Sequence, residues 1–172
     1  FSAAFASRLN DLFRFEVREA KDGDEIRSNL VLIAPGGTQM GVKKMGDKLF
    51  VKVTDDAPVN RHKPSVDYLF KSVAEQGLGN SVAVILTGMG ADGAREMKTL
   101  KDLGVRTIAQ DEQTCVVYGM PREAVAKGGV EHVLPLENIA QKILSLVETQ
   151  SSEKNISTRE PEDMKREFKK TG

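Results

Sequence analysis

The spacing of hydrophobic residues changes along the chain and predicts regions of two kinds. In residues 1–12, apolar side chains recur at positions 1, 5, 9 and 12, which predicts an amphipathic helix. Residues 13–18 alternate apolar and charged side chains, as a half-buried strand does, and residues 30–34 form a short apolar run typical of a buried strand. Residues 41–44 and 48–53 flank a turn and predict a small antiparallel hairpin. The first third of the chain therefore combines one helix with short strands.

From residue 64 onward, helical and strand patterns alternate. The expected helices span residues 64–76, 91–103, 121–126 and 136–147, and the expected strands span residues 82–87, 105–109 and 131–134. Pro64 lies in the first turn of one helix and Gly104 follows the last turn of another, which supports these bounds. Strands that alternate with helices favour a parallel sheet covered on both faces. The expected fold class is therefore α/β, with a mostly parallel sheet and a small antiparallel hairpin.

The last part of the chain has a different composition. Residues 151–161 hold one large apolar residue, and a helix over 162–170 would present only Met164 and Phe168 as an apolar face. Such a segment has too little apolar surface to offset the entropy lost when a chain becomes ordered. We expect one domain over residues 1–148 and a polar, mobile tail over 149–172, with a partner-docking helix as the alternative for the tail.

Composition and charge exclude several classes of protein. The chain has 172 residues, and its 25 basic and 25 acidic side chains give no net charge, so nothing points to nucleic acid or an anionic membrane as a partner. Cys115 is the single cysteine, which excludes an internal disulfide and fits a reducing compartment. No apolar run approaches the roughly 20 residues that span a bilayer, and no signal-peptide pattern is present. We expect a soluble, cytoplasmic protein. Because the chain opens inside a helical pattern and without Met, we also expect it to be a fragment.

The turn Gly88-Met-Gly-Ala-Asp-Gly93 is the main candidate site. It follows an apolar run and precedes a helical pattern, so it lies at the carboxyl end of an expected parallel strand, where open α/β sheets place functional groups. Its glycine spacing matches a dinucleotide-binding fingerprint, with Asp111 as the later acid. Against that interpretation, Asp92 would put a carboxylate at the helix N-terminus, where the phosphate should bind. A purely structural helix cap is a second interpretation of Asp92.

A third interpretation makes Asp92 the orienting carboxylate of a hydrolytic triad. Such a carboxylate fixes the tautomer of a histidine and stabilises the imidazolium that forms during the reaction. Met89, between two glycines, would direct its backbone N–H into the same crevice, where it could stabilise an oxyanion. Asp92 and Met89 are therefore the candidate catalytic residues, and the residues alone leave the three interpretations open.

A triad assembled within the chain is less favoured. Ser65 and His62 could be combined with Asp92, but Ser65 follows Pro64 in the first turn of an expected helix, where serine commonly caps. No strained strand-to-helix elbow surrounds Ser65. His62 could line a substrate cleft instead.

Three other features are expected to be structural. His132 lies on a short expected strand. Cys115 is expected in or near the core, and a catalytic role for it is disfavoured because no histidine neighbours it in the sequence. Residues 21–25 lack the complete calcium-loop pattern and predict a solvated turn.

Several segments, in order, resemble the catalytic domain of the chemotaxis methylesterase family CheB. They are residues 33–37 (IAPGG), 64–70 (PSVDYLF), 86–94 (LTGMGADGA), 109–112 (AQDE) and 117–124 (VYGMPREA), while residues 1–9 resemble the family's segment just after its histidine. The similarity runs from residue 1 to about residue 148. It implies a Rossmann-like, doubly wound α/β domain that hydrolyses γ-glutamyl methyl esters on chemoreceptors, deamidates certain glutamines and uses no cofactor or metal.

The resemblance assigns roles to two residues of this chain. Asp92 corresponds to the triad aspartate and Met89 to the methionine on the oxyanion side, whereas Gln39 stands where the family often has histidine. The family's nucleophilic serine, in a G-x-S-x-G-G turn, and its histidine, in a Q-H-M-P stretch, have no counterpart here. The chain alone is therefore expected to be inactive.

The resemblance also implies partners. They are the methylated cytoplasmic helices of chemoreceptors and an amino-terminal receiver domain of the same protein, and the protein is expected to be a monomer. A non-catalytic, receptor-binding fragment is the alternative, and a dinucleotide-binding domain is a further one.

Overall fold

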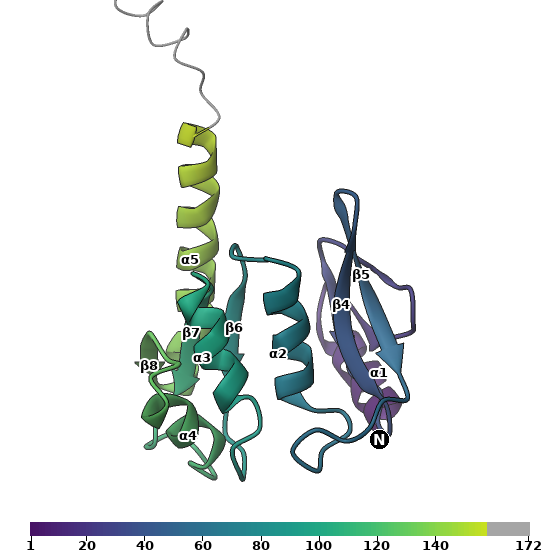
Figure 1. Ribbon diagram of the computed structural model, residues 1–172, viewed down its shortest axis with the longest axis horizontal. Coiled ribbons are helices and arrows are strands. Elements are labelled where there is room, and N and C mark those ends of the chain that lie inside the picture. The colour runs from purple at the N-terminus through teal and green to yellow at the C-terminus, as the bar shows by residue number, and fades with distance from the viewer. Residues whose placement is uncertain (158–172) are drawn as a thin grey trace, which may run out of the picture.

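The computed structural model describes residues 1–157, and the polar helix expected at 162–170 lies outside the described residues (Figure 1). The amino-terminal region, residues 1–54, contains α1 (Ser2–Leu12), β1 (Glu16–Glu19), β2 (Glu25–Ile26), β3 (Leu30–Ile33), β4 (Gln39–Met45) and β5 (Lys48–Thr54). The carboxy-terminal region, residues 66–157, contains α2 (Val66–Glu75), β6 (Val82–Ile85), α3 (Ala94–Asp102), β7 (Arg106–Gln110), α4 (Met120–Ala126), β8 (His132–Leu134) and α5 (Leu136–Ser157).

The strands form three sheets among the described residues. β1 pairs with β3 in parallel, β6-β7-β8 is a parallel sheet, and β2-β5-β4 is antiparallel. The α/β class and the hairpin of β4 and β5 are therefore confirmed. The expectation of one sheet is refined, because the parallel strands divide into two short sheets that lie on either side of α2 (Figure 1). The two-residue strand β2, which pairs with β5, was not expected from the sequence.

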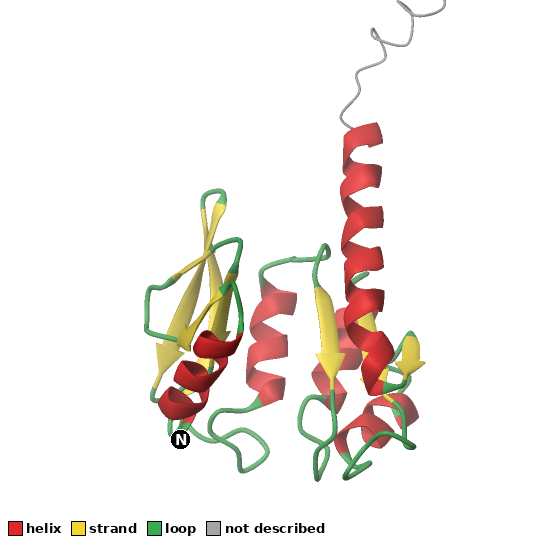
Figure 2. Cartoon of the chain, turned by 180° about the vertical axis from the view of Figure 1, so that it is seen from behind, coloured by secondary structure: helices red, strands yellow, loops and turns green. Residues whose placement is uncertain are grey.

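Helices cover both faces of the β6-β7-β8 sheet, as expected. Ala83 and Ile85 of β6 pack in one apolar cluster with residues of α2, α3 and α4. Ile108 of β7, whose side chain points the other way, packs with Ile139 and Leu146 of α5. Alternate residues of a strand point to opposite faces, so these strands, buried on both sides, read as nearly continuous apolar runs. Figure 2 shows α5 in front of this sheet and α3 and α4 behind it.

Several element boundaries differ from the expected ones, among them the start of α3 and the end of α5. α3 begins at Ala94 because Gly93 has a left-handed φ of 88°, which interrupts the helix before Ala94. α5 continues to Ser157, beyond the expected end at Val147 and into the segment expected to be a mobile tail. Once a helix has formed, adding a residue costs little, and the weakly periodic sequence after Val147 contains no proline or glycine before residue 157.

Helix α2 joins the two regions and brings two helix starts together. A side-chain carbon at Gly41 of β4 would lie 3.0 Å from the Ser72 hydroxyl, so glycine allows α2 to pack closely on β4. On its other side, a carbon at Gly93 would lie 2.6 Å from the Val66 side chain. Glycine at position 93 therefore allows the first turn of α2 to lie against the segment that leads into α3.

Candidate active site

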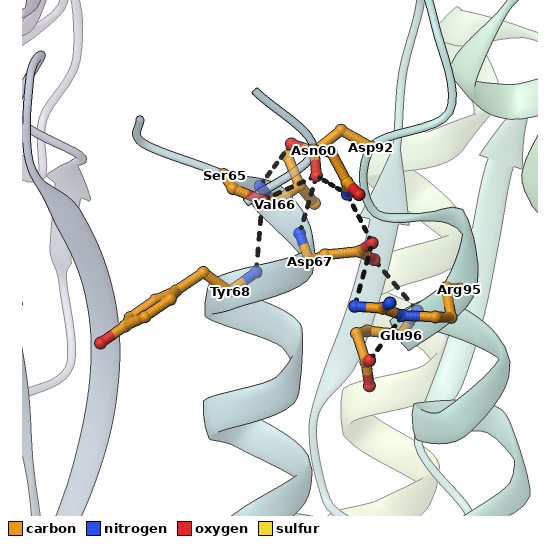
Figure 3. A network of polar contacts seen from close by, with 8 residues as sticks. All are labelled: Asn60, Ser65, Val66, Asp67, Tyr68, Asp92, Arg95 and Glu96. Atoms are coloured by element: carbon orange, nitrogen blue, oxygen red, sulfur yellow. Dashed lines mark hydrogen bonds and ion pairs between the residues drawn. The ribbon is translucent and has the colours of Figure 1, made fainter. Parts of the chain in front are cut away.

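Asp92 lies beyond the carboxyl end of β6, as expected, but it caps a different helix from the one predicted. Its Oδ2 accepts a hydrogen bond from the Val66 backbone N–H at 2.7 Å, and its Oδ1 accepts one from the Asp67 N–H at 3.3 Å. The Ser65 hydroxyl donates to Oδ1 at 2.7 Å. The expectation that Asp92 sits at the start of its own helix is therefore wrong, because Gly93 turns the chain and directs the carboxylate to the N-terminus of α2 (Figure 3).

Asp67, in the first turn of α2, does the same for α3. Its Oδ1 accepts a hydrogen bond from the Glu96 backbone N–H at 3.1 Å. The Arg95 guanidinium lies 3.7 Å from Oδ2 of the same carboxylate. Each of the two helices thus begins on a carboxylate that comes from the other helix or its leading turn. These contacts satisfy backbone N–H groups that have no partner within their own helix.

The environment of Asp92 favours its charged form. Burial is the largest single influence on its pKa and acts to raise it. Hydrogen bonds from Asn60, Ser65 and the two backbone N–H groups act in the opposite direction and together prevail, so the pKa of Asp92 lies below its ordinary value. The positive end of the α2 dipole supports the same charge. Although only 6% of Asp92 is exposed, its carboxylate is therefore ionised at neutral pH.

Met89 lies in the same turn and faces solvent. It is 84% exposed, and its backbone N–H has no hydrogen-bond partner among the described residues. The turn itself is fixed from one side, because the carbonyl of Gly88 accepts hydrogen bonds from Gly119 N–H at 3.2 Å and Met120 N–H at 2.8 Å. A side-chain carbon at Gly119 would lie 2.6 Å from that carbonyl, so only glycine allows this approach. Met89 thus presents a backbone donor on a firmly held turn.

Two open hollows flank this turn. One, of about 710 Å³, is lined by residues that include Asp92, Gly90 and His62. The other, of about 420 Å³, is lined by residues that include Met89, Gly90 and Tyr118. The two candidate catalytic residues therefore open onto adjoining hollows rather than onto separate parts of the surface.

The arrangement of Ser65 and His62 does not form a triad. Ser65 is buried, its hydroxyl contacts Asp92 directly, and its Oγ accepts the Tyr68 N–H at 3.4 Å as an N-cap. In a triad the imidazole stands between the hydroxyl and the carboxylate. The helix-cap interpretation of Ser65 agrees with this geometry, while His62 lines the hollow beside Asp92.

Two residues to which sequence reasoning gave no role complete the site. Asn60 donates one hydrogen bond from Nδ2 to Asp67 at 2.7 Å and another from the same nitrogen to Asp92 at 2.8 Å. Gln39 is buried, donates to the carbonyls of Ala57 and His62 at 3.1 and 3.2 Å, and accepts the Ser65 N–H at 2.9 Å. Contacts between residues so distant in the sequence leave no periodic signal, so no pattern could have predicted them.

The dinucleotide interpretation does not fit the geometry. The N-terminus of α3 is already occupied by the Asp67 carboxylate through the Glu96 N–H. Asp111 accepts hydrogen bonds from the backbone N–H and the hydroxyl of Thr114, as in a local turn. A pyrophosphate would have to displace a buried carboxylate that is already hydrogen-bonded, which is unfavourable.

The remaining candidates occupy structural positions. His132 Nε2 lies 3.4 Å from Glu131, which is also paired with Arg106, and burial is the main cause of the lowered pKa of His132. Cys115 is partly buried and burial raises its pKa, which disfavours a reactive thiolate. Asp24 in the 21–25 turn accepts hydrogen bonds from Arg18 and the Lys21 N–H.

Two other kinds of feature are absent from the described residues. These residues contain no group of three or more histidine, cysteine or acidic side chains placed to hold a metal ion. None of the helices within them has the length and apolar character to cross a bilayer.

Comparison with known proteins places the chain in a family. The family model described as CheB methylesterase matches residues 1–143. The protein-glutamate methylesterase/protein-glutamine glutaminase 2 of Dechloromonas aromatica is 52% identical over 144 residues, which cover 84% of this chain and 40% of that protein. The corresponding protein 1 of Chromobacterium violaceum is 52% identical over 146 residues, which cover 85% of this chain and 41% of that protein.

A solved structure supports the same family assignment. The crystal structure of the Thermotoga maritima CheB methylesterase catalytic domain has a TM-score of 0.82 and 37% sequence identity, and the match covers 86% of this chain and 78% of that one. The chain spans less than half the length of the curated relatives it matches. With the family model matched over most of its length and the fold shared, the chain belongs to the CheB methylesterase family.

Proposed function

We propose that this chain supplies the triad carboxylate and one oxyanion donor of a protein-glutamate methylesterase that also deamidates glutamine. The observation that carries the proposal is the Asp92 carboxylate, which is buried and charged at the end of β6 and fixed by four hydrogen bonds. Its two neighbouring hollows give a substrate access to both Asp92 and Met89. The names of the relatives, which are methylesterases and glutaminases, support the reaction class.

The proposed mechanism needs a serine and a histidine from outside this chain. The serine attacks the carbonyl carbon of a γ-glutamyl methyl ester while the histidine accepts its proton. Asp92 accepts a hydrogen bond from the other nitrogen of that imidazole and stabilises the imidazolium. The Met89 N–H stabilises the oxyanion of the tetrahedral intermediate. The histidine returns the proton to methanol as it leaves. Water then hydrolyses the acyl-enzyme, which regenerates the serine hydroxyl and leaves a glutamate side chain on the receptor. The proposed substrates are methylated chemoreceptor helices, and a receiver domain of the same protein is the proposed regulator.

A chimera tests this proposal. In it, this chain replaces the matching 144 residues of the Dechloromonas aromatica relative, so that the rest of that protein supplies the missing residues. We expect the chimera to release methanol from methylated receptor and the isolated chain to release none. Asp92→Asn should lower kcat about 10⁴-fold, because the imidazole loses its orienting acceptor.

Asp102→Asn is the matched control. Asp102 is an exposed aspartate of α3 that is paired with Lys98, away from the turn after β6. It should leave methanol release unchanged. Full activity of the Asp92→Asn chimera would overturn the triad role, and methanol release by the isolated chain would overturn the need for outside residues. A chimera that binds receptor without any hydrolysis would favour the non-catalytic alternative.

A further inference from the structure

Asn60 bridges the two carboxylates that start helices α2 and α3. Its Nδ2 carries two hydrogens and lies 2.7 Å from an oxygen of Asp67 and 2.8 Å from an oxygen of Asp92 (Figure 3). Both carboxylates are almost inaccessible, with exposed fractions of 2% for Asp67 and 6% for Asp92. Two negative charges held so close repel each other unless donors lie between them. The amide of Asn60 supplies those donors without adding charge.

The backbone around Asn60 is arranged to direct that amide. Asn60 and Arg61 both have left-handed φ values, of 53° and 66°, which non-glycine residues rarely adopt. They are the two central residues of a tight turn closed by hydrogen bonds between Val59 and His62 at 2.8 and 3.1 Å. The carbonyl of His62 also accepts a hydrogen bond from Gln39 Nε2 at 3.2 Å. A strained turn that is held by surrounding contacts at a polar site suggests a role for its conformation.

The hydrogen bonds of Asp92 are unevenly divided between its two oxygens. Oδ1 accepts three, from Asn60, Ser65 and the Asp67 N–H. Oδ2 accepts one among the described residues, from the Val66 N–H. Each carboxylate oxygen has about two acceptor sites, so Oδ1 is fully used and Oδ2 retains capacity for one more donor. The contacts to Oδ1 therefore determine in which direction Oδ2 points.

We propose that Asn60, anchored by Asp67, is a positioning residue that fixes the rotation of the Asp92 carboxylate so that Oδ2 receives the imidazole N–H of the triad. This inference rests on the proposed function, because it takes the imidazole N–H of the triad as the second donor to Oδ2. Asn60 acts through Asp92 and does not react with the substrate. Asp67 holds the second hydrogen of the amide, which prevents Asn60 from rotating away.

Kinetics of the chimera test the proposal. Asn60→Ala should lower kcat about 10- to 100-fold and leave KM within about twofold, because the imidazole is misoriented while substrate binding persists. The weaker carboxylate–imidazole contact should also lower the pKa of that histidine, so the acidic limb of the profile of kcat/KM against pH should move to lower pH. A merely structural role would not move this limb.

Asn29→Ala is the matched control for Asn60→Ala. Asn29 is also an exposed asparagine with a left-handed φ, of 59°, so its replacement has a similar backbone cost and removes no contact to Asp92. It should leave kcat and the pH profile unchanged. The proposal fails if Asn60→Ala changes activity no more than Asn29→Ala does, or if it raises KM with kcat unchanged, which would make Asn60 a substrate-binding residue.

The anchoring role of Asp67 has its own measurement. If Asp67 acts through Asn60, the double variant Asn60→Ala/Asp67→Asn should lose little more kcat than Asn60→Ala alone. The reason is that Asn60→Ala already removes the hydrogen bonds through which Asp67 would act on Asp92. Circular dichroism must first establish that both variants are folded. Independent, multiplicative losses would overturn the anchoring role.

A measurement on the isolated chain separates this inference from the proposed function. Titration of the Asp92 carboxyl carbon by NMR should give a higher pKa in Asn60→Ala than in the wild type, by about 0.5–1 unit, and no change in Asn29→Ala. An inactive wild-type chimera together with this shift would reject the proposed function but keep Asn60 as the residue that holds Asp92. An unchanged pKa in Asn60→Ala would overturn the inference itself.

Discussion

The amino-terminal and carboxy-terminal regions use the same kinds of element but bury their apolar side chains to different degrees. In the carboxy-terminal region, residues of β6, β7, α3 and α4 form a continuous buried cluster, with a second cluster under α5. In the amino-terminal region, the apolar stripe of α1 remains largely exposed, at Phe1, Phe5 and Leu12. Hydrophobic burial therefore stabilises the carboxy-terminal region far more than the amino-terminal one.

The site lies where these two regions meet, and each region contributes residues to it. The carboxy-terminal region supplies Asp92 and Met89 on a turn that is fixed by the packed sheet. The amino-terminal region supplies Gln39 at the start of β4, whose amide holds the loop that carries Asn60. The comparison indicates that the packed core fixes the position of the Asp92 turn, while polar contacts from residues 60–67 set the orientation of its carboxylate. The less packed region acts on this orientation through Gln39, which holds the loop that carries Asn60.

The largest expected effect compares leucines of the two regions. Leu100→Ala, at a position that is 1% exposed in the α3 cluster, should lower the free energy of unfolding by about 2–5 kcal/mol. Leu12→Ala, at a position that is 69% exposed at the end of α1, should change it by less than about 0.5 kcal/mol. Urea denaturation followed by circular dichroism measures both, and similar losses would contradict the difference between the regions.

The next effect concerns the carboxylate at the junction. Asp92→Asn should lower the free energy of unfolding at pH 7 by about 1.5–3 kcal/mol, since an amide nitrogen then meets donors that need an acceptor. The folded-state pKa of Asp92 is lowered, so its contribution is present above the unfolded value of about 3.9 and is lost as pH falls through the folded value. The difference between wild type and Asp92→Asn should therefore shrink below about pH 4. A constant difference between pH 7 and pH 3 would contradict the lowered pKa.

A smaller effect tests how firmly the Met89 turn is held. Gly119→Ala should destabilise the chain by about 1–3 kcal/mol, because the added carbon would lie 2.6 Å from the Gly88 carbonyl oxygen. Gly79→Ala is the control, since its added carbon would make an ordinary contact, 3.5 Å from the Leu103 carbonyl, at a φ outside the left-handed range. Thermal unfolding of both variants gives the comparison, and equal midpoints would mean that the turn can shift freely.

The smallest effect should be the same in both regions. Lys48 pairs with Glu25 at 3.0 Å on the amino-terminal hairpin, and Lys98 pairs with Asp102 at 2.5 Å along α3, all with exposed side chains. Replacing either lysine with alanine should cost less than about 0.5 kcal/mol, because solvent screens such pairs. Denaturant titration of the two variants checks this. A large loss of unfolding free energy in one of the two variants would mean that surface charge, rather than the core, accounts for the difference in stability between the regions.

Local patterns predicted the helices and most strands because each depends on neighbouring residues. The continuous apolar run at 82–86 indicates a strand that is buried on both faces, and the spacing of apolar residues in 94–102 indicates which face of the helix is buried. The division of the parallel strands into two sheets depends on how α2 packs, and α2 packs through Gly41 and Gly93. A single glycine gives the same signal for a tight turn and for a close approach between helices, so the sequence could not distinguish them.

The sequence predicted where Asp92 lies in the fold but not which residues surround it. The strand-end rule placed Asp92 correctly, because it depends only on where an apolar run ends. Which helix Asp92 caps depends on the left-handed φ of Gly93 and on the proximity of Val66, both set by tertiary packing. Asn60 and Asp67 were unassigned for the same reason, since their partners lie 32 and 29 residues further along the chain.

The reciprocal capping of α2 by Asp92 and of α3 by Asp67 also constrains which substitutions this family can accept over evolutionary time. Asp67 completes the start of α3 and Asp92 completes the start of α2, so a substitution at either position leaves donors unmatched on the opposite helix. Natural variants that lose one of these acids should therefore carry a compensating change at the other acid or at position 60. In an alignment of relatives, these three positions should vary as a group, whereas exposed neighbours such as Arg61 should vary one at a time.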